Sequence, residues 1–294
     1  MKKIYCIVIL ISTAAAFISC AKKPEKSSWE KIFSKKLEHS HYFVGFSNET
    51  NGITVGYGGK CFYTEDGGQS WKEAVNESAC RFGLDINGEK TAWHCGNGEN
   101  INITEDGGKT WKKAGSFLST RSPDHTRCIS FSENQKDGWA ASRKILGITN
   151  DGGKTWAQPE LPEGISDIGA VFLLSPASGY IFDCTLNKLF FTEDSAKSWT
   201  AIDLPKEAKS ISTDASPMSV INADQSGKIL FITNKSEKDT NRISAFISSN
   251  KGKTWKEEII EAGAGYLFLN KNTTLLTHLG LDGTTNLFKA KSKL

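Results

Sequence analysis

The sequence predicts an all-β fold in which small antiparallel sheets follow one another around a closed ring, a β-propeller. Three observations lead to this prediction. One eight-residue stretch occurs five times, its tryptophans lie 40, 45, 43 and 56 positions apart, and several short apolar runs separated by turn residues fill each interval. Periods of this length are typical of one four-stranded sheet repeated around an axis.

The repeated stretch reads as a tight turn between two strands, and one copy runs from Thr104 to Trp111 (TEDGGKTW). The aspartate can accept hydrogen bonds from backbone N–H groups just ahead of it, and the glycines supply the positive φ that such turns need. Its acidic pairs look like calcium ligands or catalytic carboxylates, but their repetition favours a structural turn. The residues assigned to these turns are Asp66, Trp71, Asp106, Trp111, Asp151, Trp156, Asp194, Trp199 and Trp255.

Two copies depart from the pattern. The fourth has Ser195 and Ala196 in place of both glycines, and the fifth has Asn250 in place of the aspartate, with Lys251 ahead of Gly252. Residues other than glycine seldom adopt positive φ, so the sequence leaves the geometry of these two turns open.

Each repeat contains four strand-like runs whose alternation fits half-buried strands rather than helices. After the fifth turn three such runs remain and an outer strand is missing, whereas residues 28–33 resemble the end of a turn followed by an outer strand. We therefore predict a six-bladed propeller of four-stranded antiparallel blades, the last of which is closed by the N-terminal strand. Five blades are the alternative if Trp29 belongs to the preceding tether.

Residues 1–20 have the features of a bacterial lipoprotein signal. Lys2 and Lys3 give the charged start, the apolar run that follows is short for a bilayer span, and Cys20 comes after the small Ser19. We divide the chain into a signal peptide (1–19), a lipidated tether (20–27) and a propeller (28–294). Because the residues before Ser19 depart from the usual lipobox, plain secretion or an uncleaved anchor are alternatives.

A lipid such as palmitate on Cys20 would attach the protein to a membrane without spanning it. The tether is rich in Lys, Pro and Ser and has almost nothing to bury. We expect a place in the bacterial cell envelope, at the outer membrane or the cell surface rather than the inner membrane.

Charge and histidine placement argue against several functions. The chain has 36 basic and 33 acidic residues, and removal of Lys2 and Lys3 brings its formal net charge to about +1. This balance lacks the basic stripe that nucleic-acid binding needs. The five histidines are dispersed without ligand-type spacing, so we expect no metal and no cofactor.

The cysteines leave the disulfide pattern open. Beyond Cys20 there are five, an odd number that implies at least one free thiol outside the cytoplasm. Cys80 could pair with Cys95 or with Cys128, and buried unbonded thiols are an equal alternative. The full set is Cys61, Cys80, Cys95, Cys128 and Cys184.

The repeated turn resembles the Asp-box or BNR repeat, S/T-x-D-x-G-x-T-W, and the copies at Asp66, Asp106 and Asp151 match it in full. In Asp-box families these turns lie on the propeller face away from the ligand site, and the resemblance implies the same here. The TEDGGKTW boxes and the run Asp137-Gly138-Trp139-Ala140 make the chain similar to photosystem II assembly-factor (Ycf48-like) propellers. That likeness covers about Ser28 to Leu294 and implies a non-catalytic scaffold that binds a protein partner through an arginine-bearing face.

Asp-box propellers also include sialidases and other glycoside hydrolases. The sialidase pattern needs an arginine cluster, a Tyr nucleophile with a Glu partner and an acidic proton donor, and its first arginine precedes the first box. No arginine lies between Trp29 and Thr64, and no Tyr–Glu pair stands out. We therefore favour a protein that is not an enzyme, with a glycoside hydrolase or a carbohydrate-binding propeller as the alternative.

We expect binding on the face opposite the boxes, where the few arginines and the longest loops coincide. The candidate residues are Arg81, His94, Arg127, Arg143 and Asp183. The functional prediction is a membrane-tethered propeller with an assembly or scaffold role, which binds a protein partner or, alternatively, a glycan.

Overall fold

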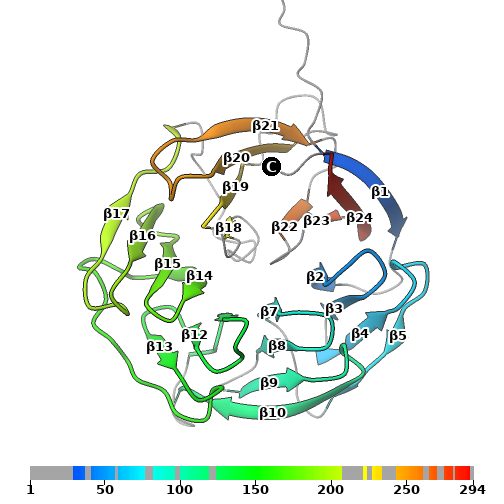
Figure 1. Cartoon of the computed structure of the whole chain (residues 1–294), viewed down its shortest axis with the longest axis horizontal. Helices are drawn as coiled ribbons and strands as arrows, with labels where there is room; N and C mark the ends of the chain where they lie inside the picture. Colours follow the sequence, from blue (N-terminus) through cyan, green and yellow to red (C-terminus); the bar gives the residue numbers. More distant parts are fainter. Residues whose placement is uncertain are drawn as a thin grey trace, which may run out of the picture.

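The computed structural model describes residues 29–36, 41–56, 59–76, 82–96, 100–118, 124–206, 221–223, 227–233, 243–260, 265–269, 275–280 and 282–291. Its regular elements within these ranges are all β-strands, and their sheets are arranged in a ring (Figure 1). The prediction of an all-β propeller is therefore confirmed. The part of the chain that is described contains no helix with the length and hydropathy needed to cross a membrane. The predicted signal peptide and tether, with Cys20, lie outside the described residues.

Six sheets form the described ring, and in five of them the strands are consecutive in the sequence. Sheet 1 contains β2 (His41–Phe46), β3 (Gly52–Gly56), β4 (Cys61–Thr64) and β5 (Lys72–Glu73); sheet 2 contains β6 (Val75–Asn76), β7 (Gly83–Ile86), β8 (Ala92–Cys95), β9 (Asn100–Thr104) and β10 (Thr110–Ser116); sheet 3 contains β11 (Cys128–Phe131), β12 (Gly138–Ala141) and β13 (Leu146–Thr149). Sheet 4 contains β14 (Ile168–Ser175), β15 (Ser178–Asp183), β16 (Lys188–Thr192) and β17 (Thr200–Ile202); sheet 5 contains β18 (Ile221–Ala223), β19 (Ile229–Thr233), β20 (Ile243–Ser248) and β21 (Lys256–Ile260).

Sheet 6 joins the two ends of the described chain. It consists of β22 (Gly265–Leu269), β23 (Leu275–Gly280), β24 (Thr284–Ala290) and, on its outer side, β1 (Trp29–Lys36). β1 pairs antiparallel with β24, so that Trp29 lies opposite Ala290, and the Trp29 side chain is buried in a cluster with Leu276 and Phe288. The N-terminal strand thus supplies the missing outer strand, as the sequence predicted, and the pairing leaves no open edge on β24.

The prediction of four strands in every sheet is wrong for sheets 2 and 3. In sheet 2, β6 crosses from the preceding repeat and pairs parallel with β10. In sheet 3, Ala157 makes the bridge to β13, with two backbone hydrogen bonds of 2.8 Å to Ile148, and no fourth strand is formed by the described residues. Pro159 and Pro162 follow shortly and have no N–H to donate, so they do not continue the ladder.

Side chains from neighbouring sheets pack together between them. The rings of Trp93 in sheet 2 and Phe131 in sheet 3 stack with centroids 4.2 Å apart, and both side chains are fully buried. Near the centre, the Phe131 N–H donates to the Asp85 carboxylate at 2.6 Å, and the Leu173 N–H donates to the Ser130 hydroxyl at 3.0 Å. These bonds join the inner strands β7, β11 and β14 of three successive sheets.

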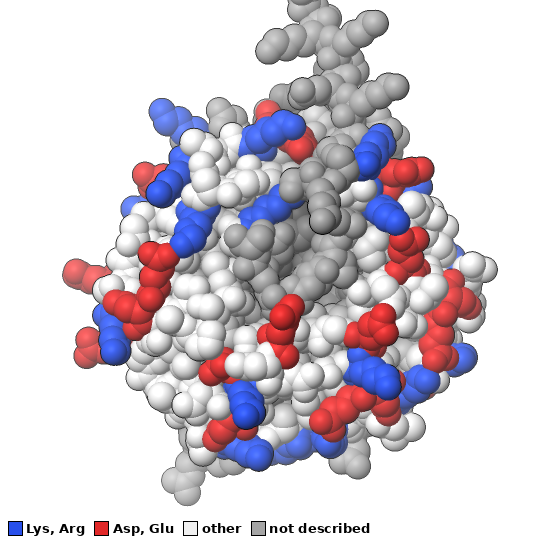
Figure 2. Space-filling view, in the orientation of Figure 1, with Lys and Arg blue, Asp and Glu red and all other residues white. Residues whose placement is uncertain are grey.

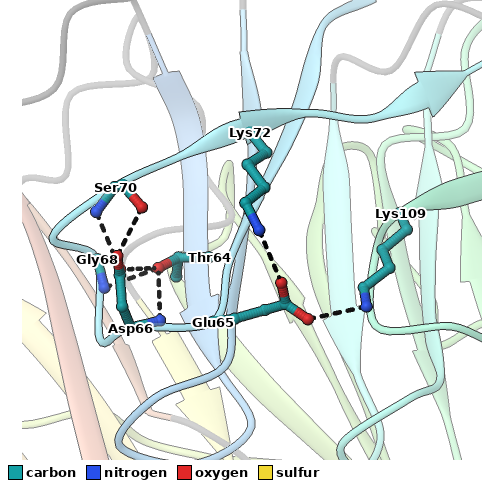
Figure 3. A network of polar contacts seen from close by, with 7 residues as sticks. All are labelled: Thr64, Glu65, Asp66, Gly68, Ser70, Lys72 and Lys109. Carbon is teal, nitrogen blue, oxygen red and sulfur yellow. Dashed lines mark hydrogen bonds and ion pairs between the residues drawn. The ribbon is translucent and has the colours of Figure 1, made fainter.

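The box turns have the internal hydrogen bonds that the sequence predicted (Figure 3). In the first box the Thr64 hydroxyl donates to Asp66 Oδ1 at 2.8 Å and accepts from the Gly68 N–H at 2.9 Å. Asp66 Oδ1 also accepts from the Ser70 N–H at 2.9 Å. The Ser70 hydroxyl and its N–H, followed by the Thr64 hydroxyl, lower the pKa of Asp66 well below its ordinary value. The carboxylate is therefore occupied within its own turn.

The two departing boxes adopt the same turn. Ser195 and Ala196 take φ values of 60° and 64°, the left-handed region that glycine occupies in the other boxes. In the fifth box Lys251 has φ 59°, and the Asn250 side chain replaces aspartate by accepting from the Thr254 N–H at 2.8 Å. The geometry left open by the sequence is thus conserved in all five turns despite the substitutions.

Candidate binding face

The face opposite the boxes is formed by the segments that enter the inner strands and by the turns between second and third strands. Because neighbouring strands run antiparallel, these segments lie at the strand ends remote from the box turns. In sheets 3 and 4 they comprise residues 124–127, 142–145, 165–167 and 184–187. We refer to these four segments together as the box-free face.

An ion pair joins sheets 3 and 4 on this face. Arg127 Nη1 contacts Asp167 Oδ1, and the two side chains are only 15% and 22% exposed. The Arg127 N–H donates to the Ala141 carbonyl at 2.8 Å, which fixes the residue beside β12. Since the guanidinium is already paired with a carboxylate and is largely buried, its main role in this structure is to connect two sheets.

Asp183 is also engaged within the protein. Its side chain has no exposed surface, and Oδ2 accepts from the N–H groups of Ser166 and Asp167, both at 2.8 Å. Oδ1 accepts from the Leu186 N–H at 2.7 Å. The carboxylate therefore holds two loops of the box-free face in place and does not itself reach the surface.

Arg143 is the predicted residue whose side chain is exposed on this face. Its N–H donates to Asp124 Oδ2 at 3.1 Å, and its carbonyl accepts from the Ile168 N–H at 2.7 Å. The backbone is thus fixed from two sides, while the guanidinium has no hydrogen-bond or ion-pair partner among the described residues. It is available to an external carboxylate or carbonyl oxygen.

An aromatic pair that the sequence did not single out lies on the same side of the ring. The rings of Phe82, which precedes β7, and His125, which precedes β11, stack with centroids 5.6 Å apart and an interplanar angle of 25°. His125 is exposed and its N–H donates to Asp124 Oδ1 at 2.9 Å. Both residues belong to irregular segments of different repeats, so no spacing in the sequence indicated the pair.

The structure does not place His94 on the surface to which the sequence assigned it. Its side chain is fully buried, the centroid of its ring lies 4.4 Å from that of the Trp111 ring, and neither ring nitrogen has a hydrogen-bond partner among the described residues. The reason is that β8 is covered on both sides by neighbouring sheets, which the alternation of a single strand does not reveal. Arg81, the remaining candidate, lies outside the described residues.

Cys61 and Cys95 are fully buried, and the thiols of Cys128 and Cys184 form no disulfide with another described residue. Burial raises the pKa of Cys128 to about 12, and burial followed by the Asp167 charge raises that of Cys184 to about 12. These groups are therefore protonated at neutral pH. Cys80, on which the two predicted pairings depended, lies outside the described residues.

No group of three or more His, Cys, Asp or Glu side chains in the described ranges is arranged to hold a metal ion. Acidic and basic side chains alternate along much of the rim in Figure 2 rather than separating into areas of one sign. The features that distinguish the box-free face are thus the exposed guanidinium and the aromatic pair.

Comparisons with known proteins agree with this architecture. The profile of the family described as "Sortilin, neurotensin receptor 3" matches residues 144–278. No curated protein matches the chain. Among solved structures, "YCF48 bound to D1 peptide" is 18% identical with a TM-score of 0.56 and covers 91% of this chain and 98% of its own.

Two further structures have the same fold. YCF48 from Cyanidioschyzon merolae is 18% identical, with a TM-score of 0.54 and coverage of 90% of this chain and 99% of its own. A protein of unknown function from Bacteroides thetaiotaomicron is 9% identical, with a TM-score of 0.62 and coverage of 90% and 74%. At these identities the likeness shows the fold alone. The chain is thus similar to a Sortilin-type repeat over part of its length and to YCF48 propellers in overall fold.

Proposed function

We propose that this protein is a non-catalytic, membrane-tethered propeller whose box-free face binds a segment of a partner protein. In this proposal the propeller has six blades, and each described sheet is one blade. The observation that carries the proposal is the Arg143 guanidinium, which is exposed and unpaired among the described residues while its backbone is fixed by Asp124 and Ile168. A fixed backbone reduces the entropy that the side chain loses on binding.

The chemistry of this face favours a peptide ligand that carries a carboxylate. A guanidinium can bind a carboxylate through two parallel hydrogen bonds, and the nearby Phe82–His125 pair offers an apolar and aromatic surface for the neighbouring side chain. The similar structure named "YCF48 bound to D1 peptide" supports the idea that a propeller of this kind can hold a peptide. An assembly or scaffold role would follow from such binding.

The tether is supported by the sequence. Lys2, Lys3, the apolar run and Ser19-Cys20 together form the lipoprotein-type signal. A lipid on Cys20 would hold the propeller at a membrane of the cell envelope, and our proposal places it at the outer membrane or cell surface. Fractionation of cells producing a Cys20→Ser variant tests this, because a protein that remains in the membrane fraction would contradict lipid anchoring.

Capture of a partner from detergent-solubilised membranes tests the binding face. Arg143→Glu should abolish capture, because it reverses the charge that meets the carboxylate. Lys154→Glu is the matched control, since Lys154 is exposed on the box turn of the same sheet, at the opposite face. Arg127→Ala is a poorer probe, because it would leave the Asp167 carboxylate without its partner. Equal capture by the Arg143→Glu and Lys154→Glu variants would show that the box-free face is not the binding site, and retention on a glycan array instead of protein capture would favour a carbohydrate ligand.

A further inference from the structure

The outer strand of sheet 6 carries closely spaced positive charge. β1 contains Lys31, Lys35 and Lys36, all exposed, and a single acidic residue, Glu30. From Lys31 to Lys36 an extended strand spans about 17 Å. The three lysines therefore lie within a short stretch of the rim, where β1 runs around the outside of the ring (Figure 1), with the neighbouring Lys35 and Lys36 on opposite sides of the strand.

Among the described residues, no carboxylate lies within ion-pair distance of these three ammonium groups, although Lys36 and Asp282 are near enough to interact electrostatically. Lys35 Nζ donates to the Gln69 carbonyl oxygen, and Lys31 Nζ lies 5.5 Å from the centre of the Phe288 ring. Neither a carbonyl nor an aromatic ring neutralises an ammonium charge. In the box turns and the strands that follow them, by contrast, several lysines form ion pairs with glutamates: Lys72, Lys109, Lys112 and Lys251.

An apolar side chain lies within the same run. Ile32 is 39% exposed, although it is a large aliphatic residue in the middle of a strand. Lysines that flank an exposed aliphatic side chain suit a surface that is anionic at its boundary and apolar just below it. A lipid bilayer with anionic head groups has this composition.

The short distance in sequence between β1 and Cys20 also favours contact of β1 with a membrane. Its first residue, Trp29, follows Cys20 by nine positions, and a fully extended chain of that length spans about 30 Å. We propose that the rim formed by β1 lies against an anionic lipid bilayer. This inference rests on the proposed tether at Cys20, which would hold that rim, and not the box-free face, next to the membrane.

Lysine chemistry favours lipid over a more specific partner. An ammonium is a strongly hydrated point charge without the fixed fork by which arginine recognises phosphate or carboxylate. Each lysine near an anionic bilayer strengthens binding by roughly a factor of five, so three of them give weak, reversible association. A single lipid chain is also marginal by itself, and the two contacts together would hold the protein stably.

Vesicle co-sedimentation of the unlipidated chain from Ala21 to Leu294 tests the rim directly. Vesicles of phosphatidylcholine with 30% phosphatidylglycerol should bind the protein at low salt, and pure phosphatidylcholine vesicles should not. Lys31→Gln, Lys35→Gln and Lys36→Gln in one variant should weaken binding at least about tenfold. The matched control neutralises Lys90, Lys113 and Lys154, which are exposed in other repeats and have no ion pair with a described residue, and it should bind almost as well as the original chain.

Equal weakening in the two triple variants, or no binding of the original chain to anionic vesicles, would overturn the proposal. Unchanged urea unfolding midpoints in both variants would confirm that folding is not the cause of any loss. Because this assay uses protein without lipid, its failure leaves the proposed tether and the peptide-binding face unaffected, and these are tested separately by the Cys20→Ser and Arg143→Glu variants.

Discussion

Ser195 and Ala196 provide a quantitative test of how the box turn is built, because both have positive φ and they differ in burial. A residue other than glycine in the left-handed region costs about 1–2 kcal/mol. Glycine removes this strain but loses about 0.5–1 kcal/mol more conformational entropy on folding. At φ values of 60° and 64° the backbone gain is nearly the same at the two positions. A difference between the two glycine variants must therefore come from the side chains.

The side-chain losses are unequal. Ser195 is exposed, and its hydroxyl makes only a long contact of 3.4 Å to the Pro176 carbonyl, so Ser195→Gly should stabilise the protein by about 0.5–1 kcal/mol. Ala196 is 2% exposed, and loss of its methyl group costs about 0.8 kcal/mol, which cancels the gain. For a chain of this size the melting temperature should rise by about 1–4 °C for Ser195→Gly and hardly change for Ala196→Gly.

Circular dichroism melts and urea titrations of both variants provide the measurement. The reverse exchanges in the second box are the control: Gly107 and Gly108 have φ values of 77° and 91°, and a Cβ on Gly108 would lie 2.8 Å from Ile53 Cγ1. Both Gly→Ala variants should melt lower, with Gly108→Ala the more damaged. A lower melting temperature for Ser195→Gly, or an equal rise for Ala196→Gly, would refute the reasoning from strain and burial.

Four further outcomes are expected. The Ser198 hydroxyl and N–H, then the Thr192 hydroxyl, lower the pKa of Asp194 from 3.8 to about 2. Ionised Asp194 therefore contributes stability that is present above pH 4 and is lost as the pH falls toward 2. In the Asp194→Asn variant the loss of stability between pH 4 and pH 2, measured by urea titration at each pH, should be smaller. Peptide mapping after treatment with a thiol reagent at pH 8 should show slow labelling of the buried Cys128 in the folded protein and fast labelling in urea. The half-buried Cys184 should also react slowly because its thiol pKa is raised, and rapid labelling of Cys128 in the folded protein would contradict its burial. His94→Leu should leave stability unchanged or raise it by up to about 2 kcal/mol, because both ring nitrogens are buried and have no hydrogen-bond partner among the described residues. A clear loss of stability would mean that the imidazole forms a hydrogen bond in the native protein. Arg127→Ala should destabilise the folded protein by about 1–3 kcal/mol, and the double variant Arg127→Ala with Asp167→Asn should be less destabilised than Arg127→Ala alone. If the losses of the two single variants simply added in a double-mutant cycle, the ion pair would contribute nothing to stability.

The sequence predicted those features that depend on nearby residues. Each box turn is specified within eight positions, so its hydrogen bonds could be predicted from the residue types alone, and even Asn250 supplies the acceptor that aspartate supplies elsewhere. The pairing of β1 with β24 was predictable for a different reason: one repeat lacked an outer strand and the other end of the chain had one to spare. The number of strands in each repeat was therefore enough to predict this pairing, although β1 and β24 are far apart in the sequence.

Features that depend on how neighbouring sheets face each other could not be predicted. The partner of Arg127 is Asp167, which lies in the next repeat, and its choice depends on the register between sheets 3 and 4. His94 is a polar residue of β8 but is fully buried, because neighbouring sheets cover β8 on both sides. Pro159 and Pro162 argue against a fourth strand in sheet 3, but the prediction followed the period of the repeat and assigned four strands there.

Several lysines of the box face are paired with glutamates, although Lys154 on the third box turn has no ion-pair partner among the described residues. On the box face, lysines and glutamates bond to each other across neighbouring sheets: Glu65 accepts from Lys109 at 2.8 Å as well as from Lys72 at 3.0 Å (Figure 3), and Lys251 contacts Glu193. Lys109 and then Lys72 lower the pKa of Glu65, which keeps this network ionised at neutral pH. A partner that docked there would first have to break existing ion pairs.

The box-free face and the rim of β1 present the opposite situation. Arg143 and the lysines of β1 are exposed and form no ion pair with the part of the chain that the structure describes, so an incoming carboxylate or anionic head group would meet charges that are not already neutralised there. The boxes therefore stabilise the ring, and the unpaired cations away from them are where we expect contacts with other molecules. Exchanging Glu65 for Gln should accordingly alter stability without altering partner capture, whereas Arg143→Glu should do the reverse; if Glu65→Gln also abolished capture, the division between a structural and a binding face would be wrong.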